Sequence, residues 1–226
     1  MSARYAISVL ASAGAIPRSL WRRVAAAGDP FLNPDFLTLL EHHGAAARGS
    51  GWQARHLLAS DERGCAVGLL PLYLKAHSHG DFIYDWSWAA AYRQLGHRYY
   101  PKLISCLPHT PVSGPRFLVA DSAETEAVRQ ALLAAAIDLG GEYAASSWHV
   151  ALPDAFEAEW LQRAGLLLSH DLQFHWSDSG YADFEAYLAS FSSARRRKVR
   201  AEQRQVRESG LAIETRHGDE IAAAEW

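Results

Sequence analysis

Residues 52–75 read WQARHLLASDERGCAVGLLPLYLK. Two runs rich in Leu, Val, Ala and aromatic residues, 52–60 and 65–75, flank the polar tetrapeptide Asp61-Glu62-Arg63-Gly64. Apolar runs of this length on either side of a short polar segment that contains Gly are typical of a β-hairpin. We therefore expect two paired strands in this part of the chain.

Helices and strands alternate on both sides of the hairpin. Before it, a strand is expected at 5–10, one helix begins after Pro17, and Asn33 followed by Pro34 begins another. After it, strands are expected at 82–86, 103–107, 117–120, 147–152 and 166–176. Helices are expected at 88–95, 123–139 (ended by Gly140-Gly141) and 154–164. This alternation predicts an α/β fold with a mixed sheet.

The last part of the chain follows a linker. Residues 177–181 contain Ser, Asp and Gly, which places a boundary near residue 180. One broken helix or two helices are expected at 181–210, and a strand at 211–215. The final residues look like the first turn of another helix, so we expect the 226 residues to be the front part of a longer protein.

Composition excludes several classes of protein. With 49% hydrophobic and 21% charged residues, the chain can bury a sizeable core and is not disordered throughout. No apolar run approaches the roughly 18 residues that would cross a bilayer. The two cysteines, Cys65 and Cys106, form neither a disulfide framework nor a metal-binding pair, which favours a cytoplasmic protein.

One segment differs in charge from the rest. Residues 191–210 hold seven cations and two anions, in a chain with a net charge of −3. Arg196, Arg200 and Arg204 are spaced by four, so they share one face of the expected helix and form a candidate anion-binding stripe. Its partner could be a tRNA, another polyphosphate or, through peripheral contact, an anionic membrane surface. The alternative is an ordinary solvated helix face.

Five stretches of the chain resemble one family. They are GWQARHLL (51–58), PLYLKAHSHGDFIYDWSWAAAY (71–92), RYYPKLISCLPHTPVSGPR (98–116), QFHW (173–176) and SSARRRKVRAEQRQV (192–206). In this order they resemble the FemAB-like family of peptidoglycan biosynthesis and recognition, within the GNAT acyltransferase superfamily. The resemblance implies a first GNAT-like domain at 1–180 and the start of a second, truncated one at 181–226.

The resemblance also implies a reaction. We expect a bacterial acyl- or aminoacyl-transferase that acts on an amine acceptor, such as a small molecule or a cell-wall peptide precursor. Acyl-CoA or aminoacyl-tRNA would be the donor. No cofactor is firmly implied. Two loops, 48–53 and 93–98, approach a CoA-binding pattern, but each breaks the last position of that pattern. We expect the 226 residues alone to be inactive. Two alternatives are a non-catalytic module that recognises a cell-wall precursor and a tRNA or anionic-surface binder.

Polar and aromatic residues between Lys75 and Arg116 suit a cleft that binds the acceptor, although a buried hydrogen-bond network would use the same residue types. The expected substrate-binding residues are Lys75, Asp85, Trp86, Tyr99, Tyr100, Lys102, Thr110, Arg116 and, at the end of the expected strand 166–176, His175. The pair His77 and His79 has the spacing of metal ligands but no accompanying motif, so no metal site is expected. No residue stands out as the catalytic one.

Overall fold

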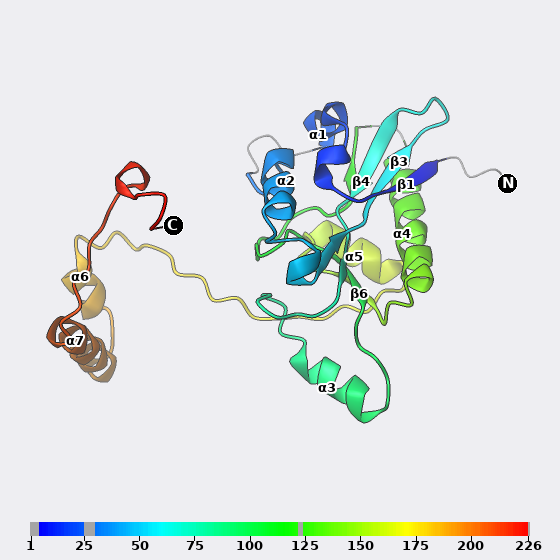
Figure 1. Ribbon diagram of the computed structural model, residues 1–226. Coiled ribbons are helices and arrows are strands. Elements are labelled where there is room, and N and C mark those ends of the chain that lie inside the picture. Colours follow the sequence, from blue (N-terminus) through cyan, green and yellow to red (C-terminus); the bar gives the residue numbers. More distant parts are fainter. Residues whose placement is uncertain (1–4, 25–29, 122–123, 226) are drawn as a thin grey trace. The chain divides into compact units, whose positions relative to one another are not determined.

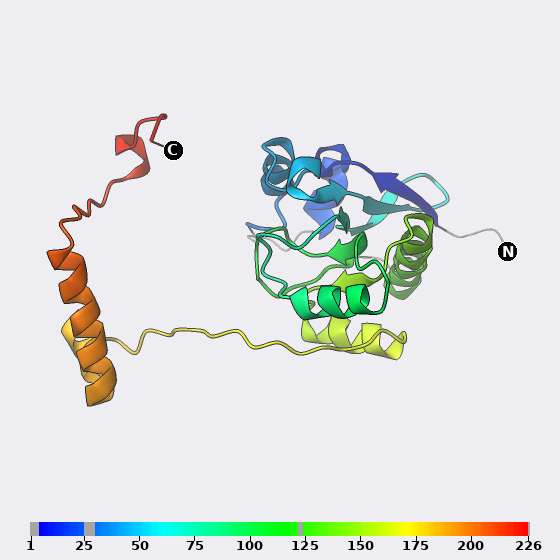
Figure 2. The same ribbon diagram turned by 60° about the horizontal axis from the view of Figure 1, so that its bottom comes forward.

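The computed structural model describes residues 5–24, 30–121 and 124–225 (Figures 1 and 2). The chain divides into two compact units, Met1–Ser169 and His170–Trp226. Residues 170–180, which we expected in the first domain, therefore belong to the second unit. That 181–226 begins a second GNAT-like domain stays a prediction.

The central hairpin forms as expected, but its two arms are shared between two sheets. The turn is held by Asp61, whose Oδ1 accepts the backbone N–H groups of Arg63 (3.0 Å) and Cys65 (2.8 Å). Its outer part pairs β3 (His56–Ser60) with β4 (Ala66–Leu70), and its inner part pairs β2 (Trp52–Ala54) with β5 (Tyr73–Lys75). Pro71 lies at the break on one arm, where its missing N–H removes a donor from the ladder.

Each sheet has four strands. The first has the order β1-β3-β4-β7, with β1 (Ala6–Leu10) and β7 (Leu118–Val119) at its edges and every neighbour antiparallel. The second has the order β2-β5-β6-β8, in which β6 (Lys102–Ser105) pairs in parallel with β8 (Trp148–Val150). This confirms the expected mixed α/β class.

Helices cover both faces of the first sheet. On one face α4 (Thr125–Glu142) and α5 (Ala155–Arg163) join a core with Leu57 and Ala59 of β3. On the other, α1 (Arg18–Val24), α2 (Pro34–His42) and the 3₁₀ turn Ala13–Ala15 pack with Leu69 and Leu118. Figure 1 shows α4 on the side of the sheet away from α1 and α2. Side chains alternate along a strand, so each sheet residue joins one of the two cores.

Local capping explains where two of the helices begin. Asn33 Oδ1 accepts the N–H of Asp35 at 2.8 Å, and Pro34 occupies the first position of α2, as expected. Asp154 Oδ1 accepts the N–H of Glu157 at 2.8 Å and caps α5. Gly96 follows α3 (Trp86–Gln94) with a φ of +76°, which favours glycine.

Four sequence expectations are wrong. Residues 82–85 form a loop that leads into α3, because Asp85 turns its carboxylate into the interior. The helix α4 continues through Gly140 and Gly141 to Glu142, because Tyr143 still packs against the core beyond them. Residues 166–176 and 211–215 are not strands, since no strand among the described residues pairs with them.

The second unit contains two helices after an extended segment. Asp183 caps α6 (Phe184–Ala189) and Ser192 caps α7 (Ser193–Glu208). Arg200 of α7 forms an ion pair with Glu185 of α6 at 2.6 Å. In this unit the side chain of Leu188 is fully buried, and the 3₁₀ turn Gly218–Glu220 follows α7. The expectation of one broken helix or two helices within 181–210 is confirmed, and the structure has two.

Candidate functional site

Two Lys–Asp ion pairs are buried among the described residues of the first unit. In the first, the Lys75 ammonium of β5 is 3.2 Å from the Asp81 carboxylate, and both side chains are fully buried. The same ammonium lies 3.5 Å from the centre of the Trp52 ring. Burial lowers the pKa of Lys75, and the attraction of Asp81 opposes this effect. Lys75 is therefore fixed by an anion and by an aromatic face rather than by solvent.

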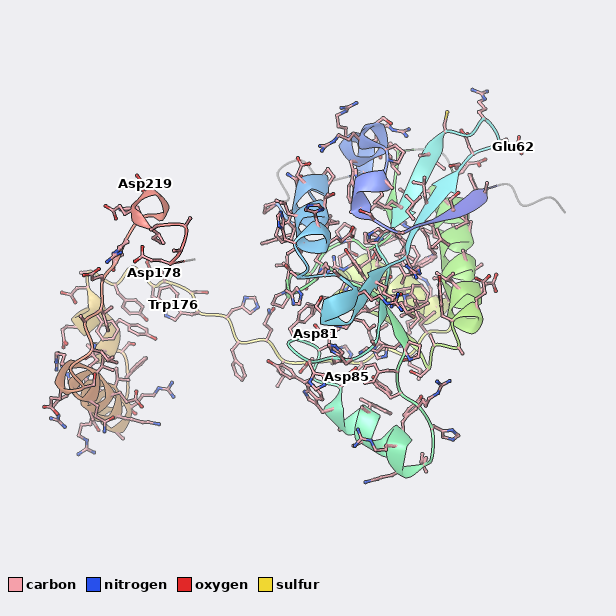
Figure 3. The ribbon with its side chains drawn as sticks, viewed as in Figure 1. Glu62, Asp81, Asp85, Trp176, Asp178 and Asp219 are labelled. Atoms are coloured by element: carbon pink, nitrogen blue, oxygen red, sulfur yellow. The ribbon has the colours of Figure 1, made fainter. Side chains whose placement is uncertain are left out.

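The second ion pair joins Asp85 to Lys102 of β6, which is the register partner of Lys75. The hydroxyl of Tyr99 donates to Asp85 at 2.9 Å, and that of Tyr100 at 3.5 Å. Burial alone would raise the pKa of Asp85, but the hydrogen bond and charge of Lys102 outweigh it and hold the pKa below its usual value. Figure 3 shows Asp81 and Asp85 on the loop that precedes α3.

The structure thus brings five of the expected substrate-binding residues into one buried network. Its members are Lys75, Asp85, Tyr99, Tyr100 and Lys102, all buried except the partly buried Tyr100. The Asp85 carboxylate is satisfied by Lys102, Tyr99 and Tyr100, whereas Lys75 and Asp81 form an ion pair at 3.2 Å but have no hydrogen-bond partner for the ammonium or for either carboxylate oxygen among the described residues. The burial of these charges matches the structural alternative for this segment. Trp86, at the start of α3, is 48% exposed and contacts the ring of His79. In Figure 1 α3 stands away from the sheets, and none of its residues is buried.

Arg116 and Thr110 have other partners. The buried guanidinium of Arg116 donates to the carbonyl oxygens of Val112 (2.6 Å), Ala151 (3.0 Å) and Leu152 (3.1 Å). The Thr110 hydroxyl donates to the carbonyl of Pro108 at 2.9 Å. These contacts fix the segment 108–116 against β8 and the residues that follow it.

Glu157 adds to the contacts that hold the segment 108–116, and no sequence pattern singled it out as a site residue. Its buried carboxylate accepts the N–H groups of Arg116 (2.7 Å) and Phe117 (2.9 Å). Burial raises the pKa of Glu157, and the two backbone donors oppose the rise. Its only sequence signal was a helix position three residues after Asp154, which by itself predicts an ordinary capping arrangement.

The remaining expected site residues lie in the second unit. His175 is exposed, and its Nε2 lies 2.9 Å from Gln173 Oε1. Of the anion-binding stripe, Arg196 donates to the carbonyl of Ala189 at 3.2 Å and Arg200 pairs with Glu185, while Arg204 is exposed. The stripe therefore exists on α7, but two of its cations already contact α6.

A cavity of about 420 Å³ lies on the first unit, in a place that the sequence did not suggest. This volume is within the range of small-molecule sites. Its polar lining includes Glu41, His42, Arg48 and Arg55. Trp52, whose fully buried ring contacts Lys75, is also one of the residues that line the cavity.

Glu41 is held in the cavity wall by three donors. Glu41 Oε1 lies 2.8 Å from His56 Nε2 and accepts the Tyr73 hydroxyl at 3.1 Å, and Oε2 accepts the Ala13 N–H at 2.8 Å. His56 Nδ1 accepts the backbone N–H of Leu72 at 3.1 Å, which assigns the ring proton to Nε2. His56 Nε2 therefore donates to Glu41.

These bonds set the charge of the cavity. Burial raises the pKa of Glu41, but the hydrogen bond from His56 and the donors of the 12–13 segment outweigh it, so the pKa is lowered. Burial raises the pKa of Tyr73 well above its usual value, so its hydroxyl remains a donor. Glu41 is a fixed negative charge with a side chain 9% exposed. Glu41, His56 and Tyr73 are far apart in sequence and share no motif, so no sequence pattern indicated them.

The described residues contain neither a cluster of metal-ligating side chains nor a helix that could span a membrane. No group of three or more His, Cys, Asp or Glu side chains in this part of the chain could hold a metal ion. His77 and His79 contact each other through their rings at 4.9 Å. None of the described helices is both long and apolar enough to span a membrane.

Comparison with known proteins places the chain in a family. No curated protein matches it. An aminoglycoside antibiotic 6′-N-acetyltransferase of Acinetobacter baumannii is 12% identical, with a TM-score of 0.46 over 78% of this chain and 99% of that one. An acetyltransferase of Trypanosoma brucei is 11% identical, with a TM-score of 0.42 over 76% and 99%. The family of peptidoglycan biosynthesis/recognition proteins matches residues 12–226, and the chain therefore belongs to the FemAB-like family.

Proposed function

We propose that this protein takes part in acyl or aminoacyl transfer to an amine on a cell-wall peptide precursor. The observation that carries this proposal is the family match over residues 12–226, whose description is peptidoglycan biosynthesis/recognition. In such a reaction the amine nitrogen forms an amide bond with the donor carbonyl, and the thioester or ester bond of the donor breaks. The ammonium group first loses one proton to solvent, and when the amide forms the nitrogen loses a second proton, which protonates the departing thiolate or alkoxide of the donor.

The cavity beside Glu41 is the proposed acceptor site. An amine acceptor arrives in water as an ammonium group, and a fixed carboxylate at the wall of a cavity attracts it. Because the lowered pKa makes Glu41 a weak base, we assign it the binding of the ammonium group and not the removal of its proton. The exposed cation Arg48 would attract a carboxylate of a peptide. The partly buried Arg55, which donates to Tyr143, Ala54 and Gln53, would add positive charge to the same wall.

The donor would use the second unit if it is an aminoacyl-tRNA. Seven cations lie between Arg195 and Arg207, and α7 has no buried residue. A row of exposed cations supports binding to the phosphates of a nucleic acid. Arg200 would then have to leave its ion pair with Glu185 in order to bind a phosphate.

Recognition without transfer is a second candidate, favoured by the network around Lys75. Because most of that network is buried, it cannot supply reacting groups to a substrate without opening. The chain would then bind the precursor at the Glu41 cavity and release it unchanged. A transfer assay separates the two candidates.

The test begins with binding to a lysine-containing cell-wall stem peptide, measured by calorimetry. We expect the peptide to bind, and its Nε-acetylated form, which lacks the charge, to bind about tenfold more weakly. Glu41→Gln should weaken binding of the free amine to the level of the acetylated peptide. The matched control is Glu62→Gln, at the exposed turn between β3 and β4 (Figure 3), which should bind like the wild type. Equal binding of the two peptides would reject the cavity as an amine site.

Transfer is then tested with the natural gene product that contains this chain. The peptide is incubated with an acyl-CoA or with aminoacyl-tRNA, and the product is examined by mass spectrometry. Addition of the acyl group at the lysine amine supports a transferase. Binding without any such product, across both donor classes, would favour recognition.

A further inference from the structure

The second unit contains its own cavity, of about 450 Å³. Its volume is again in the range of small-molecule sites. Figure 3 shows Trp176 and Asp178 in the segment that leads to α6. The cavity is lined by four aromatic rings and two carboxylates, contributed by Trp176, Asp178, Tyr181, Asp183, Phe184 and Tyr187.

The aromatic rings are arranged around Tyr187. The ring of Tyr187 meets those of Trp176 at 6.1 Å, Tyr181 at 5.3 Å and Phe184 at 5.8 Å. The planes of these pairs are inclined by 85°, 68° and 52°. Rings inclined in this way pack edge to face on one another, and the ring surface left at the cavity can attract a cation.

These rings remain open to a ligand. Trp176 is 65% exposed and Phe184 is 49% exposed, while the fully buried Leu188 of α6 packs inside the unit. Clustered exposed aromatic side chains mark a binding surface more often than isolated ones do. The ring surface is therefore available at the cavity.

The local charge selects a cation. Residues 176–187 contain Asp178, Asp183 and Glu185 and no Lys or Arg. Glu185 is paired with Arg200, so the two aspartates supply the charge of the cavity. The hydrogen bonds described for these aspartates use Oδ1: Asp178 accepts from Gly180 and Tyr181, and Asp183 accepts from Ala186. In both carboxylates Oδ2 is left for a ligand.

We propose that this cavity binds a quaternary ammonium group. The methyl groups of such a cation would contact the four rings. The cation has no N–H group to donate a hydrogen bond, so its charge would be balanced by the nearby charge of the two carboxylates. A primary ammonium group is more strongly hydrated and needs hydrogen-bond acceptors on every side, which a mostly aromatic wall does not provide. This site goes beyond the proposed transfer reaction and lies in the other unit.

The test compares two molecules of nearly the same shape. Choline carries the quaternary nitrogen, and 3,3-dimethylbutan-1-ol has a neutral carbon in its place. Titration of the whole 226-residue chain, followed by calorimetry and by the indole resonances of the tryptophans, should show choline binding about tenfold or more tightly than the neutral alcohol. Equal binding of the two would mean that the cavity binds them only as apolar molecules and does not recognise the charge, and this result would reject the proposal. Tighter binding of n-butylammonium than of choline would also reject it.

The variants are chosen to keep the unit folded. Asp178→Asn and Asp183→Asn together remove the charge, while Asn supports the same turn and helix cap as Asp. They should weaken choline binding about fivefold or more and leave the alcohol unaffected. Asp219→Asn, in the same unit but outside the cavity lining, is the matched control (Figure 3). Unchanged choline binding in the double variant would overturn the proposal. Because no part of this test depends on acyl transfer, its result is independent of the proposed function.

Discussion

The ammonium nitrogen of Lys75 lies 3.5 Å from the centre of the Trp52 ring, and the two residues are register partners on β5 and β2. Trp52 also lines the cavity that contains Glu41. One aromatic residue thus contacts the interior ion-pair network and also belongs to the lining of the proposed acceptor site. Rigidity of the network should therefore fix the position of one wall of the cavity.

The first prediction concerns the Lys75–Asp81 pair. Lys75→Met removes the charge, keeps most of the side-chain volume and leaves Asp81 buried without its cation, which should lower the free energy of unfolding by about 3–5 kcal/mol. The measurement is urea denaturation followed by circular dichroism. A loss below about 1 kcal/mol would show that Lys75 is solvated in solution.

A compensating variant serves as the control for this prediction. Lys75→Met combined with Asp81→Asn removes both charges and should recover much of the lost stability, because no unpaired charge remains. If the double variant is as unstable as the sum of the two single variants, the two side chains are not coupled.

Much of the fold follows from local sequence rules, and the exceptions share a physical cause. Asn33, Asp154 and the Asp61 turn act within a few residues, so their caps and turn could be predicted. A strand, in contrast, needs a partner, and residues 166–176 and 211–215 have β-like composition but no strand edge among the described residues. Composition cannot tell whether an edge is available.

The site was predicted less well than the fold, for a related reason. The residue types between Lys75 and Arg116 were correctly identified as polar and aromatic, and the structure does bring five of them together. Whether such a group faces solvent or the interior depends on what covers it, which periodicity does not encode. Glu41, His56 and Tyr73 come from α2, β3 and β5, so only the packing of α2 beside the sheets unites them.

The second prediction concerns His149 of β8, whose Nε2 lies 2.9 Å from Ser147 Oγ. Burial and the charge of Lys102 lower its pKa to about 4. In the unfolded chain a histidine titrates near 6.5, so between about pH 6.5 and 4 the unfolded state binds a proton that the folded state does not. Stability should therefore fall as the pH falls through this range.

The measurement is the free energy of unfolding between pH 7 and 4, with NMR titration of the histidine resonances. His149→Gln should reduce the loss of stability over this range, and His97→Gln, at an exposed histidine, should leave it unchanged. A resonance of His149 that titrates near its ordinary value would contradict the prediction.

The third prediction concerns the two thiols. Cys106 is buried, and burial together with the charge of Asp81 raises its pKa to about 12, whereas Cys65 is exposed beside the hairpin turn. Since the thiolate is the reactive form, a disulfide reagent should label one thiol in the native chain and two in denaturant. Cys65→Ser should abolish labelling of the native chain. Rapid labelling of Cys106 under native conditions would mean that the strand around it opens easily.

The fourth prediction concerns α7 and nucleic-acid binding. If the stripe of Arg196, Arg200 and Arg204 contacts the phosphates of tRNA, each contact contributes about 0.7–0.9 to the slope of log affinity against log salt. Changing all three to Gln should flatten that slope by about two to three. Because exposed charges contribute little to stability, the melting temperature should change little. The measurement is a salt titration of tRNA binding.

Two further variants make this last test specific to the stripe. Changing Arg195, Arg197 and Lys198 to Gln removes the same number of charges from other faces of α7 and should flatten the slope less. Glu185→Gln should strengthen tRNA binding, because it releases Arg200 from its 2.6 Å ion pair. Equal slopes for the two triple variants would mean that α7 contributes only its net charge. An unchanged affinity in Glu185→Gln would show that Arg200 does not bind phosphate.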